Sequence, residues 1–508
     1  MIKNALKGSN DKAFNIDYSC SKCREKDAYI SFKGMVEAVR KCFEKAGLNY
    51  IEYDEKVNET IFYFADNKWQ EVKKATINAC NYLDFKLEPK VKILKANTYE
   101  VDGYVLKSPK KTEILVITQN CECGESRSVS QRWKIVVSSY TETKDGRVLH
   151  LRNNLARVLP SGQELPAKLN DLWVKARESC TGVKPLAVEH VSFPIDIVYT
   201  WVNDLDKQWI KKKEEHIRDL DLSNGEDIKN KPKSSTDISR YRNRNELLYS
   251  LRSVYMYAPF IRKIYIVSDD QVPEWLDTEC KKVEVVFHRD IFDEATAYPV
   301  FSSRPIELNI PNINGLAEHF IYMNDDFFIC SPVNPSDFFM SNGLAKIFFS
   351  NRRLDARQVQ DYDRATVAAH KNAATAFERK LGYSITSKIT HAPYSIRLSA
   401  CKEMETVFSE EISITKHNRF RSWDDITWSH LAPFFMFYKG YSVSADIKAK
   451  YLLVQDQNLE EKLRDYDNSD TLQVVCVNDT DDVLGKGHEG LFINWMNKRF
   501  PLSAPWEK

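Results

Sequence analysis

From Pro194 onward, short apolar runs alternate with helical patterns and polar loops, and this alternation limits most strongly how the chain can fold. Between two of the runs, apolar residues recur at helical spacing from Asn245 to Ala258, just before Pro259. Strands that alternate with helices favour a mostly parallel sheet covered by helices. We therefore predict an α/β fold for this part of the chain. Its predicted buried strands are Ile195–Tyr199, Lys263–Val267, Val283–Phe287 and Phe320–Met323.

The amino-terminal part has a different pattern. Short helical patterns such as Met35–Phe43 alternate with strand-like runs such as Thr60–Phe64 and Glu113–Ile117, separated by lysine-rich turns. A chain of 508 residues also exceeds the usual size of one domain. We predict an α+β accessory domain over residues 1–185, without a catalytic constellation, and a catalytic domain over residues 190–508.

Charge and cysteine content exclude several classes of protein. Lysine and arginine number 73 against 72 acidic residues, so no overall basic field favours nucleic acid as a partner. No apolar run approaches the ~20 residues of a membrane helix, and the first residues lack the apolar core of a signal peptide. We therefore expect a cytoplasmic protein whose eleven cysteines are mostly reduced thiols. Cys20 and Cys23, with Cys121 and Cys123, offer a weaker alternative, a structural zinc site.

Polar loops follow the predicted strands, and ligands of parallel sheets bind beyond the carboxyl ends of the strands. Asp325 and Asp326 in the last loop repel each other unless a cation or proton lies between them. Mg²⁺ (or Mn²⁺) bound to a diphosphate would supply that charge, while a turn or helix cap without metal is the alternative. The four loops are Thr200–Asp204, Ser268–Asp270, His288–Asp290 and Asn324–Asp326.

Other residues have both a chemical and a plain structural interpretation. His391, before a proline-bearing turn, has the features of a general base, although a structural histidine explains it as well. Arg421 suits phosphate oxygens, or pairs with the acidic residues that follow it. Asp479 ends an apolar run, and Trp201 either stacks on a nucleobase or packs in the core. The lysine-rich insertion over residues 206–236 is interpreted as a mobile surface segment, either a lid over the site or a solvated charge run.

Together these motifs resemble the Stealth family of sugar-phosphate transferases, which includes bacterial capsular polysaccharide phosphotransferases and an animal N-acetylglucosamine-1-phosphotransferase. The resemblance runs from Ile195 to the carboxyl end and leaves the first 185 residues outside it. Two departures affect local contacts: Asp204-Leu-Asp206 replaces a Gly-Ser/Thr-Asp run, and Asn243-Arg244 replaces an Asp-Asn pair. The four blocks that carry the resemblance are Ile195–Asn203, Ser239–Asp326, a third from Thr390 to Arg421, and Cys476–Asp479.

The resemblance implies a Rossmann-like, glycosyltransferase-A-like sheet and a defined reaction. A UDP-sugar would give its sugar-1-phosphate to a saccharide hydroxyl, forming a phosphodiester-linked capsular polymer and releasing UMP, with Mg²⁺ or Mn²⁺ as cofactor. His391 is then the base, Arg421 the phosphate ligand, and Asn324 a positioning residue. Asp326 and Asp479 are the expected metal or diphosphate ligands. The residues implied to shape the nucleotide-sugar pocket are Trp201, Asn203, Arg252 and Ser303.

Two alternatives remain open on the sequence alone. One is a metal-dependent glycosyltransferase that releases UDP, and the other is a non-catalytic polysaccharide-binding component of a capsule assembly. For the sugar-phosphate transferase that the resemblance implies, the expected partners are the UDP-sugar and a saccharide acceptor. A peripheral association with inner-membrane capsule-export machinery is considered as well.

Overall fold

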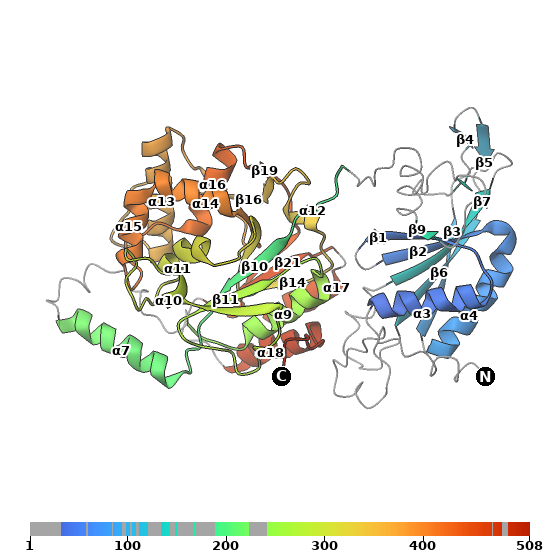
Figure 1. Cartoon of the computed structure of the whole chain (residues 1–508), viewed down its shortest axis with the longest axis horizontal. Coiled ribbons are helices and arrows are strands. Elements are labelled where there is room, and N and C mark those ends of the chain that lie inside the picture. Colours follow the sequence, from blue (N-terminus) through green and yellow to red (C-terminus); the bar gives the residue numbers. More distant parts are fainter. Residues whose placement is uncertain are drawn as a thin grey trace. The chain divides into compact units, whose positions relative to one another are not determined.

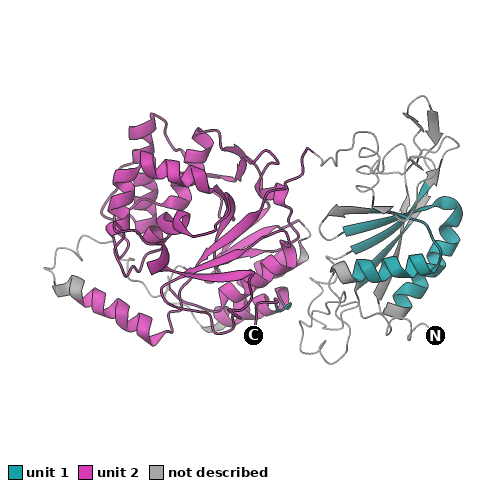
Figure 2. Ribbon diagram, viewed as in Figure 1, with its two compact units in different colours: residues 1–187, 501–503 teal, residues 188–500, 504–508 magenta. Residues whose placement is uncertain are grey.

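The structure is a computed structural model that describes residues 32–56, 59–83, 85–93, 98–101, 104–107, 111–119, 134–142, 148–149, 167–168, 188–222, 241–469, 471–479 and 486–508. The chain divides into two compact units (Figure 2). One contains residues 1–187 with 501–503, and the other contains residues 188–500 with 504–508. The division lies close to the boundary expected from the sequence. The cysteines considered for zinc, Cys20, Cys23, Cys121 and Cys123, lie outside the described residues.

The described part of the amino-terminal unit is an α+β structure, as predicted, with a mixed sheet and the helices α3 and α4 (Figure 1). The strands of the sheet follow the order β3-β6-β7-β2-β1-β9, and β8 pairs with β7. The helices are α3 (Phe32–Lys45) and α4 (Trp69–Leu83), and a short 3-10 turn, η1 (Asp66–Lys68), precedes α4. The strands are β1 (Ile51–Lys56), β2 (Glu59–Ala65), β3 (Phe85–Ile93), β6 (Lys111–Gln119), β7 (Lys134–Glu142), β8 (Val148–Leu149) and β9 (Ala167–Lys168), with a separate hairpin of β4 (Thr98–Val101) and β5 (Tyr104–Lys107).

Strand β2 shows why this sheet is covered on one face by the helices. Side chains alternate across a strand, so Phe62 and Phe64 enter the cluster that includes Val39 of α3 and Val72 of α4. Ile61 and Tyr63 point to the opposite face, where they belong to a second apolar cluster. All five central residues of β2 are buried, so both faces of this strand are shielded from water.

The carboxyl-terminal unit is built on a five-stranded sheet of the predicted α/β kind, with the order β12-β11-β10-β13-β18. The first four strands are parallel and β18 is antiparallel at the edge. The chain runs outward from β10 through β11 to β12 and then returns to the other side of β10 as β13. This reversal makes the carboxyl ends of β10 and β13 the switch point of the sheet, where ligands bind in open α/β folds. The strands are β10 (Ile195–Thr200), β11 (Ile264–Ser268), β12 (Val283–Phe287), β13 (His319–Asn324) and β18 (Tyr394–Arg397).

A second small sheet continues from the end of β13. Asp325 and Asp326 form the turn into its first strand, and the order of the sheet is β14-β21-β20. Two strand pairs complete the unit, β15 with β19 and β16 with β17. The bounds are β14 (Phe327–Ile329), β15 (Ala345–Ile347), β16 (Phe349–Arg353), β17 (Ser387–Ile389), β19 (Ser442–Ser444), β20 (Ala449–Leu453) and β21 (Val474–Asn478).

Helices surround these sheets, with α13 to α16 gathered on one side and α9, α17 and α18 on the other (Figure 1). The predicted amphipathic helix is α9, and Ser250 on it bonds both to Tyr199 of β10 and to the backbone of β14. The helices are α7 (Lys207–Leu222), α9 (Glu246–Tyr257), α10 (His288–Ile291), α11 (Ser303–Asn309), the 3-10 turn η4 (Ile310–Asn312), α12 (Pro335–Phe338), α13 (Ala365–Leu381), α14 (Leu398–Val407), α15 (Ser409–His417), α16 (Trp428–Tyr438), α17 (Leu459–Asn468) and α18 (Lys486–Arg499).

The first half of the polar insertion is helix α7 rather than a loop. Trp209 on its inner face is buried against Tyr241 and Phe301, with ring centroids 5.2 and 5.7 Å away. Lys213 lies over the ring of Tyr241 at 3.7 Å. An aromatic anchor therefore holds this charged helix on the domain, while residues 223–240 lie outside the described part. Among the helices that the structure describes, none combines the length and apolarity needed to cross a bilayer.

Candidate functional site

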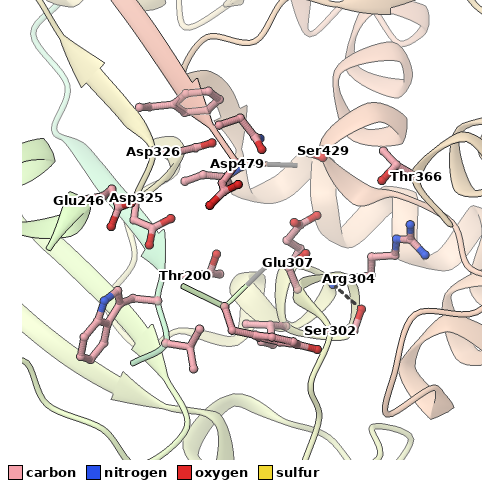
Figure 3. A pocket seen from close by; sticks show the side chains of 18 of the residues that line it. Thr200, Glu246, Ser302, Arg304, Glu307, Asp325, Asp326, Thr366, Ser429 and Asp479 are labelled. Carbon is pink, nitrogen blue, oxygen red and sulfur yellow. Dashed lines mark hydrogen bonds between the residues drawn. The ribbon is translucent and has the colours of Figure 1, made fainter. Parts of the chain in front are cut away.

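A cavity of about 490 Å³ opens at the carboxyl edge of the central sheet, at the switch point between β10 and β13. Its size lies within the range of small-molecule sites. Figure 3 shows the acidic side chains from the end of β13, from α9 and from the end of β21 at one side, with Glu307 facing them. Of the nine residues to which the family resemblance assigned a role, seven line this cavity, and Asp325 lines it as well. The seven are Trp201, Ser303, Asn324, Asp326, His391, Arg421 and Asp479.

Backbone pairing brings the widely separated segments together. Thr200 at the end of β10 lies opposite Asn324 at the end of β13. The backbone N–H of Val477 donates to the carbonyl of Asp326 at 3.0 Å, so β21 reaches the same turn and Asp479 follows two residues later. Since β18 runs antiparallel to β13, with Tyr394 opposite Tyr322, His391 approaches the same edge just before that strand begins.

Three carboxyl groups form one wall of the cavity. Burial raises the pKa of Asp326 to about 7 and that of Glu246 above its usual range. Burial, and then the nearby charges of Glu246 and Asp326, raise the pKa of Asp325 well above its ordinary value. Cys476 donates its S–H to one carboxylate oxygen of Asp326 at 3.4 Å, and the other oxygen, Oδ1, is buried without a partner among the described residues. Glu246 has an arginine partner, whereas no basic side chain lowers the pKa of Asp325 or Asp326.

Arginine side chains lie beside the acidic wall. Arg244 is almost fully buried and pairs with Asp479, with Glu246 at 3.3 Å and with Glu489 at 2.8 Å. Arg242 lies 3.5 Å from the same oxygen of Asp479, and Gln455 donates to the other oxygen. In the described structure the Asp479 carboxylate thus pairs with two arginines and accepts a hydrogen bond from the Gln455 amide. Its contacts there fix the positions of the two arginines. The sequence noted Arg244 only as a departure from the family pattern, because two of its partners, Asp479 and Glu489, come from the far end of the chain.

His391 stands at the mouth of the cavity, with its ring edge against Tyr451 at a centroid distance of 4.7 Å. The residue as a whole belongs to the exposed class, and it lines the cavity. Burial within the cavity, followed by the positive charges of Arg352 and Lys388, lowers the pKa of His391 below its ordinary value of 6.5. A neutral imidazole accepts a proton, so His391 has the protonation state of a general base at neutral pH.

Glu307 of α11 is a candidate that composition and spacing did not single out as a site residue. Burial raises its pKa to about 6, against the lowering effects of Tyr322, Arg304 and Arg421. The Tyr322 hydroxyl donates to Oε1 at 3.1 Å, whereas Oε2 is buried without a hydrogen-bond partner in the described part of the chain. An orphaned carboxylate oxygen on a cavity wall indicates a place for a donor from a ligand. Only its position in the second family block hinted at this residue.

Two of the residues implied to shape the pocket do not line it. Arg252 pairs with Glu507 at 2.8 and 2.6 Å and donates to the carbonyl of Phe500 at 3.3 Å, so it holds the carboxyl end against α9. The Asn203 side chain accepts from the backbone N–H of Leu205 at 3.1 Å and from Asn243 at 3.4 Å. Both side chains have structural contacts, and Asn203 organises the loop after β10.

A divalent cation fits the acidic wall only as a partly protein-bound ion. Across the residues that the structure describes, no group of three or more His, Cys, Asp or Glu side chains has the arrangement of a metal site. Mg²⁺, however, is usually held by one or two carboxylates, with waters and substrate phosphates as its other ligands. The unpartnered Oδ1 of Asp326 and the neighbouring Asp325 suit that role. Asp479 would have to leave Arg244 to join them.

Comparison with known proteins identifies the family of the chain. Models of the Stealth protein conserved regions 1, 2 and 3 match residues 193–218, 240–347 and 390–438. A capsular polysaccharide phosphotransferase of Haemophilus influenzae is 34% identical over 294 residues, which cover 56% of this chain and 78% of the relative. The chain belongs to the Stealth family. SacB, a capsular polysaccharide phosphotransferase of Neisseria meningitidis serogroup A, is 32% identical over 75% of this chain and 69% of its own length.

Other Stealth relatives are longer than the shared region. An exopolysaccharide phosphotransferase of Streptomyces coelicolor is 36% identical over 68% of this chain, but only 37% of its own length is covered. The chain spans 37% to 58% of the length of four such Streptomyces relatives. Among solved structures, the galactosyltransferase LgtC, in complex with donor and acceptor sugar analogues, aligns with 61% of this chain and 96% of its own, at 10% identity and a TM-score of 0.32. We draw nothing further from so distant a likeness.

Proposed function

We propose that this Stealth protein transfers a sugar-1-phosphate from a UDP-sugar to a saccharide hydroxyl, releasing UMP and forming a phosphodiester. The observation that carries the proposal is the meeting of His391, Arg421, Glu307 and Asp326 on one cavity, although they come from distant parts of the chain. The relatives named as capsular and exopolysaccharide phosphotransferases support the same reaction class.

The residues divide the reaction between them. The acceptor hydroxyl attacks the phosphorus next to the sugar, and His391 takes the proton of that hydroxyl. The bond from this phosphorus to the bridging oxygen of the diphosphate breaks, so that UMP leaves with that oxygen and the bonding electrons. The anomeric carbon–oxygen bond stays intact. Arg421 stabilises the negative charge that grows on the phosphoryl oxygens, and its charge also helps to keep Glu307 ionised. Glu307, through its unpartnered oxygen, would accept a hydrogen bond from a substrate hydroxyl and orient it.

A metal ion belongs to the proposal as well. Bound Mg²⁺ or Mn²⁺ would neutralise diphosphate charge and favour the departure of UMP. Asp326, with Asp325 beside it, would hold the ion, because burial without a counter-charge already raises the pKa of both carboxyls. Asn324 lies on the same turn and would position the donor. A peripheral association with capsule-export machinery would bring this site close to its polymer acceptor.

A labelling experiment tests the reaction class. The purified chain receives a UDP-sugar carrying a radiolabel in the phosphate next to the sugar, together with a short saccharide acceptor and Mg²⁺. We expect label in the saccharide product and unlabelled UMP, and none of either with Asp326→Asn. Label recovered in UDP would instead show the glycosyltransferase reaction, and label that stays in the donor would favour a binding protein.

A further inference from the structure

His288 is a buried histidine that the proposed reaction does not use. It begins α10, directly after β12, and only 4% of its side chain is exposed. The ring stacks on Phe292, with a centroid distance of 4.9 Å and an angle of 11° between the planes. His288 is also one of the residues that line the cavity. Neither ring nitrogen has a hydrogen-bond partner within the described structure, although buried polar atoms in proteins are nearly always bonded.

Asp269 lies beside this histidine and also lines the cavity. It follows β11, is 3% exposed, and places Oδ1 3.9 Å from Nδ1 of His288. Lys212 of α7 donates to its other oxygen at 3.0 Å, and the Tyr298 hydroxyl lies 3.3 Å from Oδ1. A carboxylate has about four acceptor positions, so Asp269 can still accept a hydrogen bond from a ligand.

The chemistry of this pair suits an uncharged group. Burial lowers the pKa of His288 to about 3, so the ring is neutral and presents one N–H donor and one nitrogen acceptor. A neutral ring gives a phosphate no counter-charge, and the carboxylate of Asp269 would repel one. A ligand group with N–H or O–H donors and carbonyl or hydroxyl acceptors would satisfy both residues.

The order of the strands places this pair at one end of the cavity. Along the carboxyl edge come His288 after β12, Asp269 after β11, Trp201 after β10, and Asp325 with Asp326 after β13. Neighbouring strands are about 4.8 Å apart, so the His288 end lies roughly 14 Å from the acidic turn. An extended nucleoside diphosphate with its phosphates at Asp326 would place its nucleoside toward His288.

We propose that His288 and Asp269 bind the nucleoside end of the donor, with Asp269 accepting from an N–H or O–H and His288 pairing with the adjacent polar atom. This inference rests on the proposed function, which supplies the nucleotide. Uracil offers an imide N–H flanked by two carbonyls, and ribose offers two hydroxyls. Both present the same chemistry to the pair.

Equilibrium binding of two probes to the full-length chain tests the inference without turnover. UMP reports on the whole nucleotide end, and pyrophosphate with Mg²⁺ reports on the phosphate end alone. His288→Leu removes both ring nitrogens, and we expect it to raise the Kd of UMP about tenfold and to leave that of pyrophosphate unchanged. His288→Gln keeps a donor and an acceptor and should restore most of the affinity. CMP and 2′-deoxy-UMP then distinguish a contact with the base from a contact with the ribose. If the pair contacts the base, the preference of the wild type for UMP over CMP should shrink in His288→Leu. If it contacts the ribose, the preference for UMP over 2′-deoxy-UMP should shrink instead.

A matched control separates loss of a contact from loss of stability. His319 is a mostly buried histidine at the start of β13, on the opposite edge of the same sheet. His319→Leu should lower Tm without changing the Kd of UMP. The inference would be overturned if wild type and folded His288→Leu bound UMP with the same Kd. It would also be overturned if His288→Leu lost equal affinity for UMP and for pyrophosphate, or if the wild-type chain did not bind UMP. Label recovered in UDP would refute phosphotransfer and leave the nucleoside site intact, so the two failures are distinguishable.

Discussion

Asp479 accepts an ion-paired hydrogen bond from Arg244, although 235 positions separate the two residues in the chain. Arg244 also contacts Glu246 at the start of α9 and Glu489 of α18. The pair therefore joins the beginning of α9, the end of β21 and the last helix beside the cavity. In the described structure, Asp479 is thus bound to arginines, whereas the sequence predicted it as a metal or diphosphate ligand.

Asp479→Asn tests these two roles against each other. The amide cannot neutralise buried Arg244, so we expect the free energy of unfolding to fall by about 1–3 kcal/mol. The donor KM should rise at least tenfold, while the Mg²⁺ concentration for half-maximal rate stays the same. As a control, Asp456→Asn removes a partly exposed ion pair with Lys462. It should change neither the free energy of unfolding nor the donor KM. A raised Mg²⁺ requirement with an unchanged donor KM would restore Asp479 as a metal ligand.

Asp326→Asn should stabilise the protein while abolishing transfer. Burial raises the pKa of Asp326 to about 7 from an ordinary value of 3.8. Between these values the folded protein holds a proton that the unfolded chain has lost, so stability falls as the pH rises through this window. The asparagine carries no charge, and we expect a gain of about 1–2 kcal/mol near pH 8 and almost none near pH 4. Denaturant unfolding at both pH values measures it, and a variant less stable near pH 8 would contradict the assignment.

Added Mg²⁺ should have the same stabilising effect on the wild type. A bound cation would supply the positive charge that Asp325 and Asp326 lack, and a ligand that binds only the folded state raises Tm. We expect Tm to rise with millimolar Mg²⁺ near pH 8, to return to its starting value with a chelator, and to stay constant in Asp326→Asn. The rise should be smaller near pH 5, where Asp326 is protonated. Equal shifts in the variant and the wild type would place the ion elsewhere.

His391→Gln should slow the chemical step without weakening donor binding. The lowered pKa of His391 means that the wild-type rate falls on the acid side only below pH 6.5, where the imidazole gains a proton. We expect kcat to fall about 10²–10⁴-fold, as for loss of a general base, and this acid limb to flatten. The pH profile of kcat at saturating donor measures both effects. His417→Gln replaces an exposed histidine of α15 whose ring contacts its own helix backbone and should leave the profile unchanged.

The sequence predicted the four parallel strands because each is a mainly apolar run that ends at a polar loop, whereas the edge strand β18, Tyr394–Arg397, is half polar and was not predicted. Asp326, His391, Arg421 and Asp479 were singled out through motifs, and the structure brings all four to one cavity. Glu307 and Arg244 were not assigned a role from the sequence, and His288 was placed only within an expected ligand loop. The importance of Glu307 and His288 depends on burial, and that of Arg244 on partners more than 200 positions away. Arg252 shows the converse. It lies inside a family block and was therefore expected in the nucleotide-sugar pocket. Its partner Glu507 is 255 residues further along the chain, and no local sequence pattern predicts that contact.

Arg252 therefore offers a test of whether a family block marks binding or folding. Its side chain and that of Glu507 are mostly buried, and the two form a bidentate pair. We expect Arg252→Ala and Glu507→Gln each to lower the free energy of unfolding by about 1–3 kcal/mol, and the double variant to lose less than the sum. Both kcat and the donor KM should stay within twofold of wild type in the folded protein. Arg357→Ala breaks an exposed pair with Asp355 and should leave stability unchanged. A tenfold rise in donor KM for Arg252→Ala without a matching rise for Glu507→Gln would return Arg252 to the nucleotide-sugar pocket, because only a direct contact with the donor would separate the two partners.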